Sequence, residues 1–192
     1  SNNFNEPLYE FLKRCSLTIE QHQRLKKYCE SIGIQYLCTP FSYKAATELA
    51  KIGVQALKIG SGEMTDMPSL EKMARTLRLP MIISTGMSSY EEIDETYQLL
   101  TGLNIPLALL NCVSEYPPDY HDINLKVIEI MAERYPKAVI GHSDHTPDIY
   151  TSLAAVALGA SIIEKHVILD KDQPGPDRAV SINFFEMASL VD

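Results

Sequence analysis

Two histidines in this sequence, His145 and His166, each follow a short apolar run and stand near a carboxylate. Asp144 precedes His145, and Glu164 lies two positions before His166. Imidazole is a common ligand of divalent metal ions, and neighbouring carboxylates orient such rings. The ends of adjacent parallel strands lie about 5 Å apart, so both rings could bind one ion. Two histidines with water in the open positions suit Mn2+, with Mg2+ or Co2+ as alternatives, although the spacing alone is more typical of structural histidines than of metal ligands.

A second group of reactive side chains centres on Lys58, which also stands at the end of an apolar run. A lysine inside a protein is costly to bury alone, so it usually meets an anion. Alternatively, a carboxylate such as Glu63 could be a structural partner for it. Thr39 and Ser84 offer hydroxyl groups at two other run ends, of the kind that hold phosphate or carboxylate oxygens. We predict an anion site bounded by Lys58, Ser61, Ser84 and Ser143.

The loop at residues 174–178 reads Pro-Gly-Pro-Asp-Arg and is stiffened by its two prolines. It follows the last apolar run, which would place it over the same end of the fold as the two histidines. Asp177 in this loop could accept a hydrogen bond from a polyol or amide substrate. Most loops of this composition have no such role.

The residues above depend on strands that end beside one another, and six apolar runs of four or five residues predict such strands. Several are nearly continuous in Val, Ile and Leu, which is typical of strands buried on both faces. The predicted strands are Ile34–Cys38, Gln55–Ile59, Met81–Ser84, Leu107–Asn111, Ala138–Gly141 and Ser161–Glu164.

Stretches with helical periodicity precede, separate and follow the strands. Thr18 and Gln21 form a predicted capping box that opens a helix ending at Ser31, and Ser88 with Glu91 opens another that runs to about Leu100. Further helices are predicted at Tyr43–Ala50, Asp66–Leu77, Asn124–Tyr135, Tyr150–Leu158 and Phe184–Val191.

Regular alternation of strand and helix predicts an α/β fold with a parallel sheet. Chemistry-capable residues follow nearly every predicted strand, which favours a (β/α)8 TIM barrel with its site at the carboxyl ends. Six βα units are recognisable, whereas a closed barrel has eight, so we expect a partial barrel. A doubly wound open sheet is the alternative, but it would gather ligand residues near one switch point.

Composition narrows the classes of partner. The net charge is −8 and no basic run is present, which argues against a nucleic-acid or membrane-surface role. No apolar stretch approaches the roughly 18 residues of a membrane span. Four cysteines without a CxxC pair fit a reducing cytoplasm. With 192 residues and no low-complexity linker, we expect one domain over 1–192.

Taken in order, the motifs resemble the N-acetylneuraminate (sialic acid) synthase family of NeuB-like enzymes over nearly the whole chain. The resemblance is carried by Thr39-Pro40-Phe41, the segments 58–63 and 84–87, Cys112 to Pro117, Ser143-Asp144-His145-Thr146, residues 154–160, Glu164-Lys165-His166 and Gly175-Pro176-Asp177. It implies a transferase of sialic acid and polysaccharide biosynthesis that condenses phosphoenolpyruvate with an N-acylated amino sugar, such as N-acetylmannosamine, and releases phosphate. It also implies a TIM barrel followed by an antifreeze-like domain, in a homodimer.

By the same resemblance, His145 and His166 hold the metal, Mn2+ first among the candidates. Lys58 matches a position that binds phosphoenolpyruvate, and Glu63 matches one that faces the sugar. Both are the catalytic candidates, with Glu63 for proton transfer or for positioning water. The remaining implied positions contact either phosphoenolpyruvate or the sugar, and they are Thr39, Ser61, Ser84, Ser114, Tyr116, Ser143 and Asp177.

The sequence holds nothing that matches the first two strands of the family or its antifreeze-like domain. Those strands carry a glutamate, a lysine and a glutamine of the active site, so we expect the 192-residue chain alone to be inactive. Two other functions stay open. One is a different phosphoenolpyruvate-dependent synthase of 3-deoxy sugar acids, and the other is a non-catalytic, metal-binding barrel fragment.

Overall fold

Strands and helices alternate along the chain, as apolar runs between amphipathic stretches require. The computed structural model describes residues 7–192 and contains a five-stranded sheet. Its strands are β1 (Leu57–Ile59), β2 (Met81–Ser84), β3 (Leu107–Cys112), β4 (Ala138–Asp144) and β5 (Ile162–Lys165). All four strand pairs are parallel, and their order in the sheet is their order in the sequence. This order has no switch point, so the doubly wound alternative is wrong.

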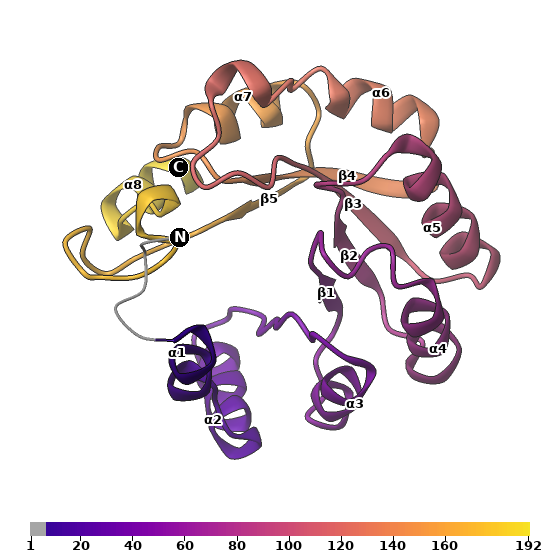
Figure 1. Cartoon of the computed structure of the whole chain (residues 1–192), viewed down its shortest axis with the longest axis horizontal. Coiled ribbons are helices and arrows are strands. Elements are labelled where there is room, and N and C mark those ends of the chain that lie inside the picture. Colours follow the sequence, from indigo (N-terminus) through magenta and orange to yellow (C-terminus); the bar gives the residue numbers. More distant parts are fainter. Residues whose placement is uncertain (1–6) are drawn as a thin grey trace.

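Figure 1 shows that the sheet curves like part of a barrel wall, with α3 to α7 along its outer side. This singly wound arrangement is a parallel five-stranded half-barrel, and it confirms the predicted α/β class and partial TIM barrel. The helices are α1 (Leu8–Cys15), α2 (Ile19–Ser31), α3 (Tyr43–Lys51), α4 (Met67–Leu77), α5 (Tyr90–Gly102), α6 (Val127–Arg134), α7 (Tyr150–Ala157) and α8 (Phe184–Val191). No helix in residues 7–192 is long and apolar enough to cross a membrane.

One predicted strand, Ile34–Cys38, is wrong. No backbone hydrogen bond joins this segment to β1 in the part of the chain that the structure describes, so it is extended but unpaired. A cavity of about 310 Å3 lies against it, and the cavity also touches β1 and β5. A run of apolar residues becomes a strand only where a neighbouring strand pairs with it, and among the described residues no strand does so here.

Helix starts follow local capping chemistry. The Thr18–Gln21 capping box at the start of α2 is confirmed. The second box lies one residue later than predicted, because Ser89 and Glu92 form it. Met87 has a φ of 63°, so the chain is still turning where the predicted box would begin.

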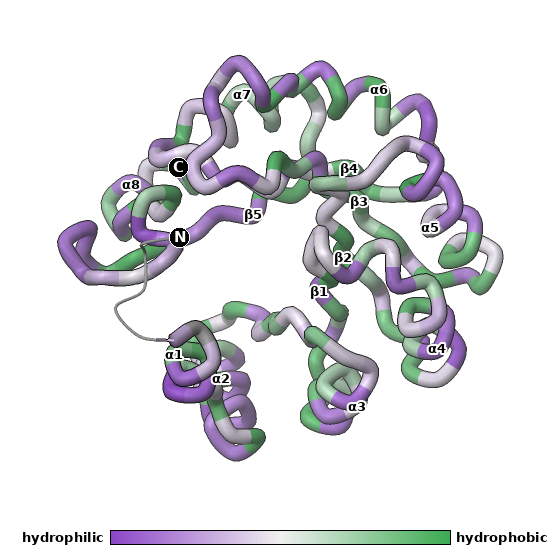
Figure 2. Tube along the Cα trace, in the orientation of Figure 1, coloured by the Kyte–Doolittle hydropathy of each residue, from purple (hydrophilic) through white to green (hydrophobic). Residues whose placement is uncertain are grey.

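The hydrophobic core fills the space between the sheet and its outer helices. Alternation along each strand sends one set of side chains outward, such as Leu57 and Ile59 in β1, Ile83 in β2 and Leu109 in β3, each at most 1% exposed. In Figure 2 the hydrophobic colour is clear along β3 and β4, whereas the end of β5 is hydrophilic. The opposite set of side chains faces the concave side, where the polar strand ends lie.

Gly141 in β4 is a position where close packing permits no side chain. A Cβ there would meet Leu110 Cδ2 at 2.5 Å and the carbonyl oxygen of Ile162 closer still. We predict that Gly141→Ala lowers the free energy of unfolding by roughly 1–3 kcal/mol, measured by urea denaturation. Gly102→Ala is the control, because a Cβ there meets nothing within 4 Å. Equal stability of the two variants would contradict the packing at Gly141.

Candidate active site

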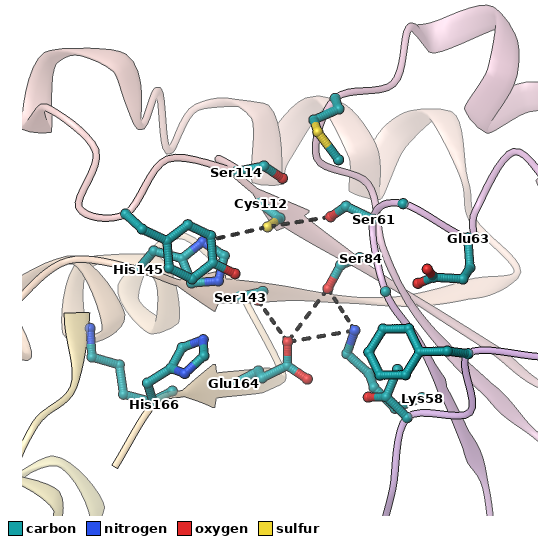
Figure 3. A pocket seen from close by; sticks show the side chains of 17 residues that line it. Lys58, Ser61, Glu63, Ser84, Cys112, Ser114, Ser143, His145, Glu164 and His166 are labelled. Atoms are coloured by element: carbon teal, nitrogen blue, oxygen red, sulfur yellow. Dashed lines mark hydrogen bonds and ion pairs between the residues drawn. The ribbon is translucent and has the colours of Figure 1, made fainter. Parts of the chain in front are cut away.

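The carboxyl ends of the strands surround a pocket of about 530 Å3. Figure 3 shows its labelled side chains converging from β1 to β5 and the loops that follow. Ten of the eleven predicted site residues line it, namely Thr39, Lys58, Ser61, Glu63, Ser84, Ser114, Tyr116, Ser143, His145 and His166. Asp177 does not line the pocket. It lies beside the pocket with Oδ2 3.8 Å from His166 Nδ1.

Lys58 is buried at the end of β1 and is held by three neighbours. Its Nζ donates to Ser84 Oγ and to the backbone oxygen of Ile59, both at 2.8 Å, and lies 3.6 Å from Glu164 Oε1. Ser143 Oγ donates to the same Glu164 oxygen at 2.7 Å. The carboxylate partner of Lys58 is therefore Glu164, whereas the structural pairing considered for the sequence was with Glu63.

Ser61 and Ser114 approach each other over Gly86. A Cβ on Gly86 would lie 2.8 Å from Ser61 Oγ and closer still to Ser114 Oγ, so a glycine is required for both hydroxyls to reach this point. Ser61 Oγ also donates to Cys112 Sγ at 3.6 Å. The structure thus brings Lys58 and the hydroxyl-bearing residues of the predicted anion site to the same pocket.

The two histidines lie on the same side of the sheet, with ring centroids 5.3 Å apart. His145 Nδ1 donates to the backbone oxygen of Val113 at 2.7 Å, which makes Nδ1 a protonated nitrogen and leaves Nε2 as the nitrogen that could bind a metal. Tyr116 stacks on His145 with centroids 4.2 Å apart. Two imidazoles on one side of the sheet fit a shared divalent ion. Within residues 7–192, no three His, Cys, Asp or Glu side chains gather into a complete protein ligand set, so water or substrate would supply the other ligands.

Burial is the main electrostatic influence in the pocket. It lowers the pKa of Lys58, although Glu164 partly opposes it. Burial also lowers the pKa of His166 against the opposing effect of Asp177, which favours the neutral ring that a metal requires. Burial raises the pKa of Tyr116 to about 12, so its hydroxyl stays protonated at neutral pH.

Two pocket residues received no substrate role from the sequence. Glu164 was expected only to orient a histidine, but its carboxylate forms an ion pair with Lys58 and accepts a hydrogen bond from Ser143. The strand register, which pairs Ser143 with Glu164, would have revealed this contact. Register cannot be predicted from the sequence of one strand alone. Cys112 was read only as part of a motif, although its buried thiol lies between Ser61 and His145.

Comparison with known proteins identifies the family. The family model described as NeuB matches residues 1–192. The chain belongs to the NeuB family.

Named relatives extend this assignment. The chain is 39% identical to the N,N'-diacetyllegionaminic acid synthase of Legionella pneumophila, over 95% of this chain and 52% of the relative. It is 37% identical to human N-acetylneuraminate-9-phosphate synthase, over 95% of this chain and 50% of the relative. A crystal structure of N-acetylneuraminic acid (sialic acid) synthetase from Leptospira borgpetersenii, in complex with citrate, superposes with a TM-score of 0.90 at 35% identity. That match covers 93% of this chain and 62% of the other. This NeuB-family chain thus spans about half the length of the curated relatives it matches.

The lowered pKa of Lys58 predicts a pH-dependent stability. A lysine whose pKa falls on folding binds its proton more weakly in the folded state. The wild type should therefore gain stability as pH rises through that lowered value toward the ~10.4 of an unfolded lysine, and Lys58→Met should lack this gain. The difference in unfolding free energy, wild type minus variant, should increase between about pH 7 and pH 10 in urea titrations.

Lys44→Met is the matched control, because Lys44 is exposed on α3. Its difference from the wild type should change little with pH. A Lys58→Met difference that is flat across the same range would contradict the burial argument.

Proposed function

We propose that the protein is a sugar acid synthase that condenses phosphoenolpyruvate with an N-acylated amino sugar, giving a nine-carbon 2-keto acid and phosphate. The observation that carries this proposal is the pocket itself, in which one buried ammonium and several hydroxyls adjoin two histidines on one side of the sheet. Relatives named as legionaminic, pseudaminic and N-acetylneuraminate-9-phosphate synthases support the same chemistry.

Lys58, Ser84 and Ser143 would bind the phosphate and carboxylate groups of phosphoenolpyruvate. The ammonium offers charge-assisted hydrogen bonds, which are stronger than neutral ones. Ser61, Ser114 and Thr39 add hydroxyl donors around the same space. Much of the rate enhancement would come from holding two substrates in one orientation.

The sugar would lie on the histidine side of the pocket. A divalent ion bound there, Mn2+ by preference, would polarise the aldehyde oxygen of the open-chain sugar. His145 and His166 would supply its imidazole ligands. Glu63 would transfer a proton or position the attacking water, and Tyr116 and Asp177 would contact the sugar.

The number of basic side chains in the pocket favours this proposal over a synthase that uses a sugar phosphate. A phosphorylated sugar would need a second set of cations, yet the lysines that line the pocket are Lys58 and Lys165. Lys165 is held by Asp144 at 3.2 Å. We therefore favour an unphosphorylated amino sugar over a sugar phosphate. A metal-binding fragment without activity would have no use for the buried Lys58 beside three hydroxyl-bearing strand ends.

The proposal extends to the cellular compartment and the oligomeric state. The four cysteines are free, which supports a reducing cytoplasm. We also propose a homodimer for the full-length protein, on the family resemblance. The 192-residue chain by itself should form no product, since the family's remaining active-site residues have no counterpart in it.

The substrate proposal predicts a specific reaction. The full-length protein, supplied with Mn2+, phosphoenolpyruvate and a panel of N-acylated hexosamines with and without a phosphate group, should release inorganic phosphate fastest with an unphosphorylated sugar. Lys58→Met should raise the KM for phosphoenolpyruvate about 10- to 100-fold, the cost of one charged hydrogen bond. Lys44→Met is again the control. Phosphate release only with sugar phosphates would overturn the assignment of the sugar.

The metal proposal predicts a separate binding result. His166→Ala removes one of two imidazole ligands, so Mn2+ affinity measured by electron paramagnetic resonance should fall at least about 10-fold. His121→Ala is the control, because His121 is exposed on the loop before α6. Unchanged Mn2+ binding by the His166 variant would contradict the two-histidine site.

A further inference from the structure

At the ends of β4 and β5, successive side chains point alternately to the two faces of the sheet. Ser143 pairs with Glu164 in the strand register, and Asp144 pairs with Lys165. Ser143 and Glu164 contact each other in the pocket, as do the rings of the two histidines that follow these pairs. Because side chains alternate along a strand, Asp144 lies on the α7 side of the sheet, and Lys165, although it also borders the pocket, directs its ammonium to Asp144.

Asp144 and Lys165 form an ion pair that is almost completely buried. Their side chains are 0% and 2% exposed, and Lys165 Nζ lies 3.2 Å from Asp144 Oδ2. Lys165 Nζ also donates to the backbone oxygen of Thr146, directly after His145. The lysine that precedes one histidine is thus bonded to the residues on either side of the other histidine.

Hydroxyl and amide donors complete the surroundings of Asp144. Its Oδ1 accepts from the backbone nitrogen of Thr146 at 2.8 Å and from Thr146 Oγ1 at 2.7 Å. Its Oδ2 accepts from Thr151 Oγ1 at 2.6 Å and from Ser152 Oγ at 2.5 Å, both in the first turn of α7. One carboxylate therefore fixes the end of β4, the loop after it and the start of α7.

We propose that the Asp144–Lys165 pair positions His145 and His166 for a shared divalent ion. Buried ion pairs lose much of their attraction to desolvation, so stability alone is a weak reason for this one, and fixing a register is the best-attested use of such pairs. Here the register in question sets the distance between the two rings. The inference rests on the proposed function, because it assumes that the two histidines bind a metal.

The test measures Mn2+ affinity of the full-length protein by electron paramagnetic resonance, for the wild type, Asp144→Asn and Ser152→Ala. Asp144→Asn keeps the size of the side chain but places an amide donor against hydroxyl donors and Lys165. We expect it to weaken Mn2+ binding about 10- to 100-fold, as loss of a residue that orients metal ligands does. Ser152→Ala removes one hydrogen bond and keeps both charges, so we expect a loss of a few fold. Glu133→Gln, an exposed carboxylate on α6, is the matched control and should bind Mn2+ as the wild type does.

A second measurement separates positioning from general damage. Phosphoenolpyruvate binding in the presence of EDTA depends on Lys58, Ser84 and Ser143, which lie on the other face of the sheet from Asp144. It should stay within about twofold in both variants if Asp144 acts only through the histidines. If Asp144→Asn does not fold, the Ser152→Ala result decides: a selective loss of Mn2+ affinity supports the proposal, and an unchanged affinity overturns it.

The outcomes distinguish this inference from the proposed function. Normal Mn2+ binding by the wild type and by a folded Asp144→Asn variant would overturn the positioning role and leave the synthase proposal standing. A parallel loss of Mn2+ and phosphoenolpyruvate binding would also overturn it, since that indicates a general structural role. A wild type that binds no Mn2+ would overturn the metal site and the positioning role together.

Discussion

The ion pair between Lys58 and Glu164 joins the two outermost strands of the five-stranded sheet. Lys58 belongs to β1 and Glu164 to β5, yet Nζ and Oε1 are 3.6 Å apart. A flat sheet would hold these strands some 19 Å apart, at about 4.8 Å for each of four steps. The contact is compatible only with a strongly curved sheet, and that curvature is what creates the concave side and its pocket. Ser84 and Ser143 connect β2 and β4 to the same two charges.

The charges in the pocket are unevenly balanced. Lys58 faces two carboxylates, Glu63 and Glu164, whereas Lys165 is occupied by Asp144 on the other side of the sheet. An anionic substrate that approached Lys58 would compete with Glu164 for it. A divalent cation on His145 and His166 would offset the excess of negative charge, so the two halves of the proposed site depend on each other.

Much of the fold could be predicted because the signals are local. Apolar runs set five of the six predicted strands, and the polar residue after each run identifies the pocket. Ile34–Cys38 has the same apolar pattern as the other predicted strands but pairs with no strand between residues 7 and 192. Pairing depends on the segment that lies alongside, and the pattern of one segment does not reveal it. Glu164 illustrates the same limit for the site. Strand register and sheet curvature bring its carboxylate to Lys58, and neither can be predicted from the residues around Glu164. The shared location of Lys58, His145 and His166 in one pocket could be predicted, because all three stand at strand ends on the same edge of the sheet.

The sequential strand order has a consequence for how the chain folds. Each strand from β2 onward pairs with the strand made just before it, so the sheet can grow by one βα unit at a time with short loop closures. The Lys58–Glu164 contact is the exception, because its two residues stand at opposite ends of that series. Until β5 docks, Lys58 has Ser84 and the nearby Glu63 but lacks its ion pair with Glu164, and the pocket has no wall on that side. Strand order therefore permits the backbone scaffold to form by local steps, whereas the Lys58–Glu164 contact requires the last strand.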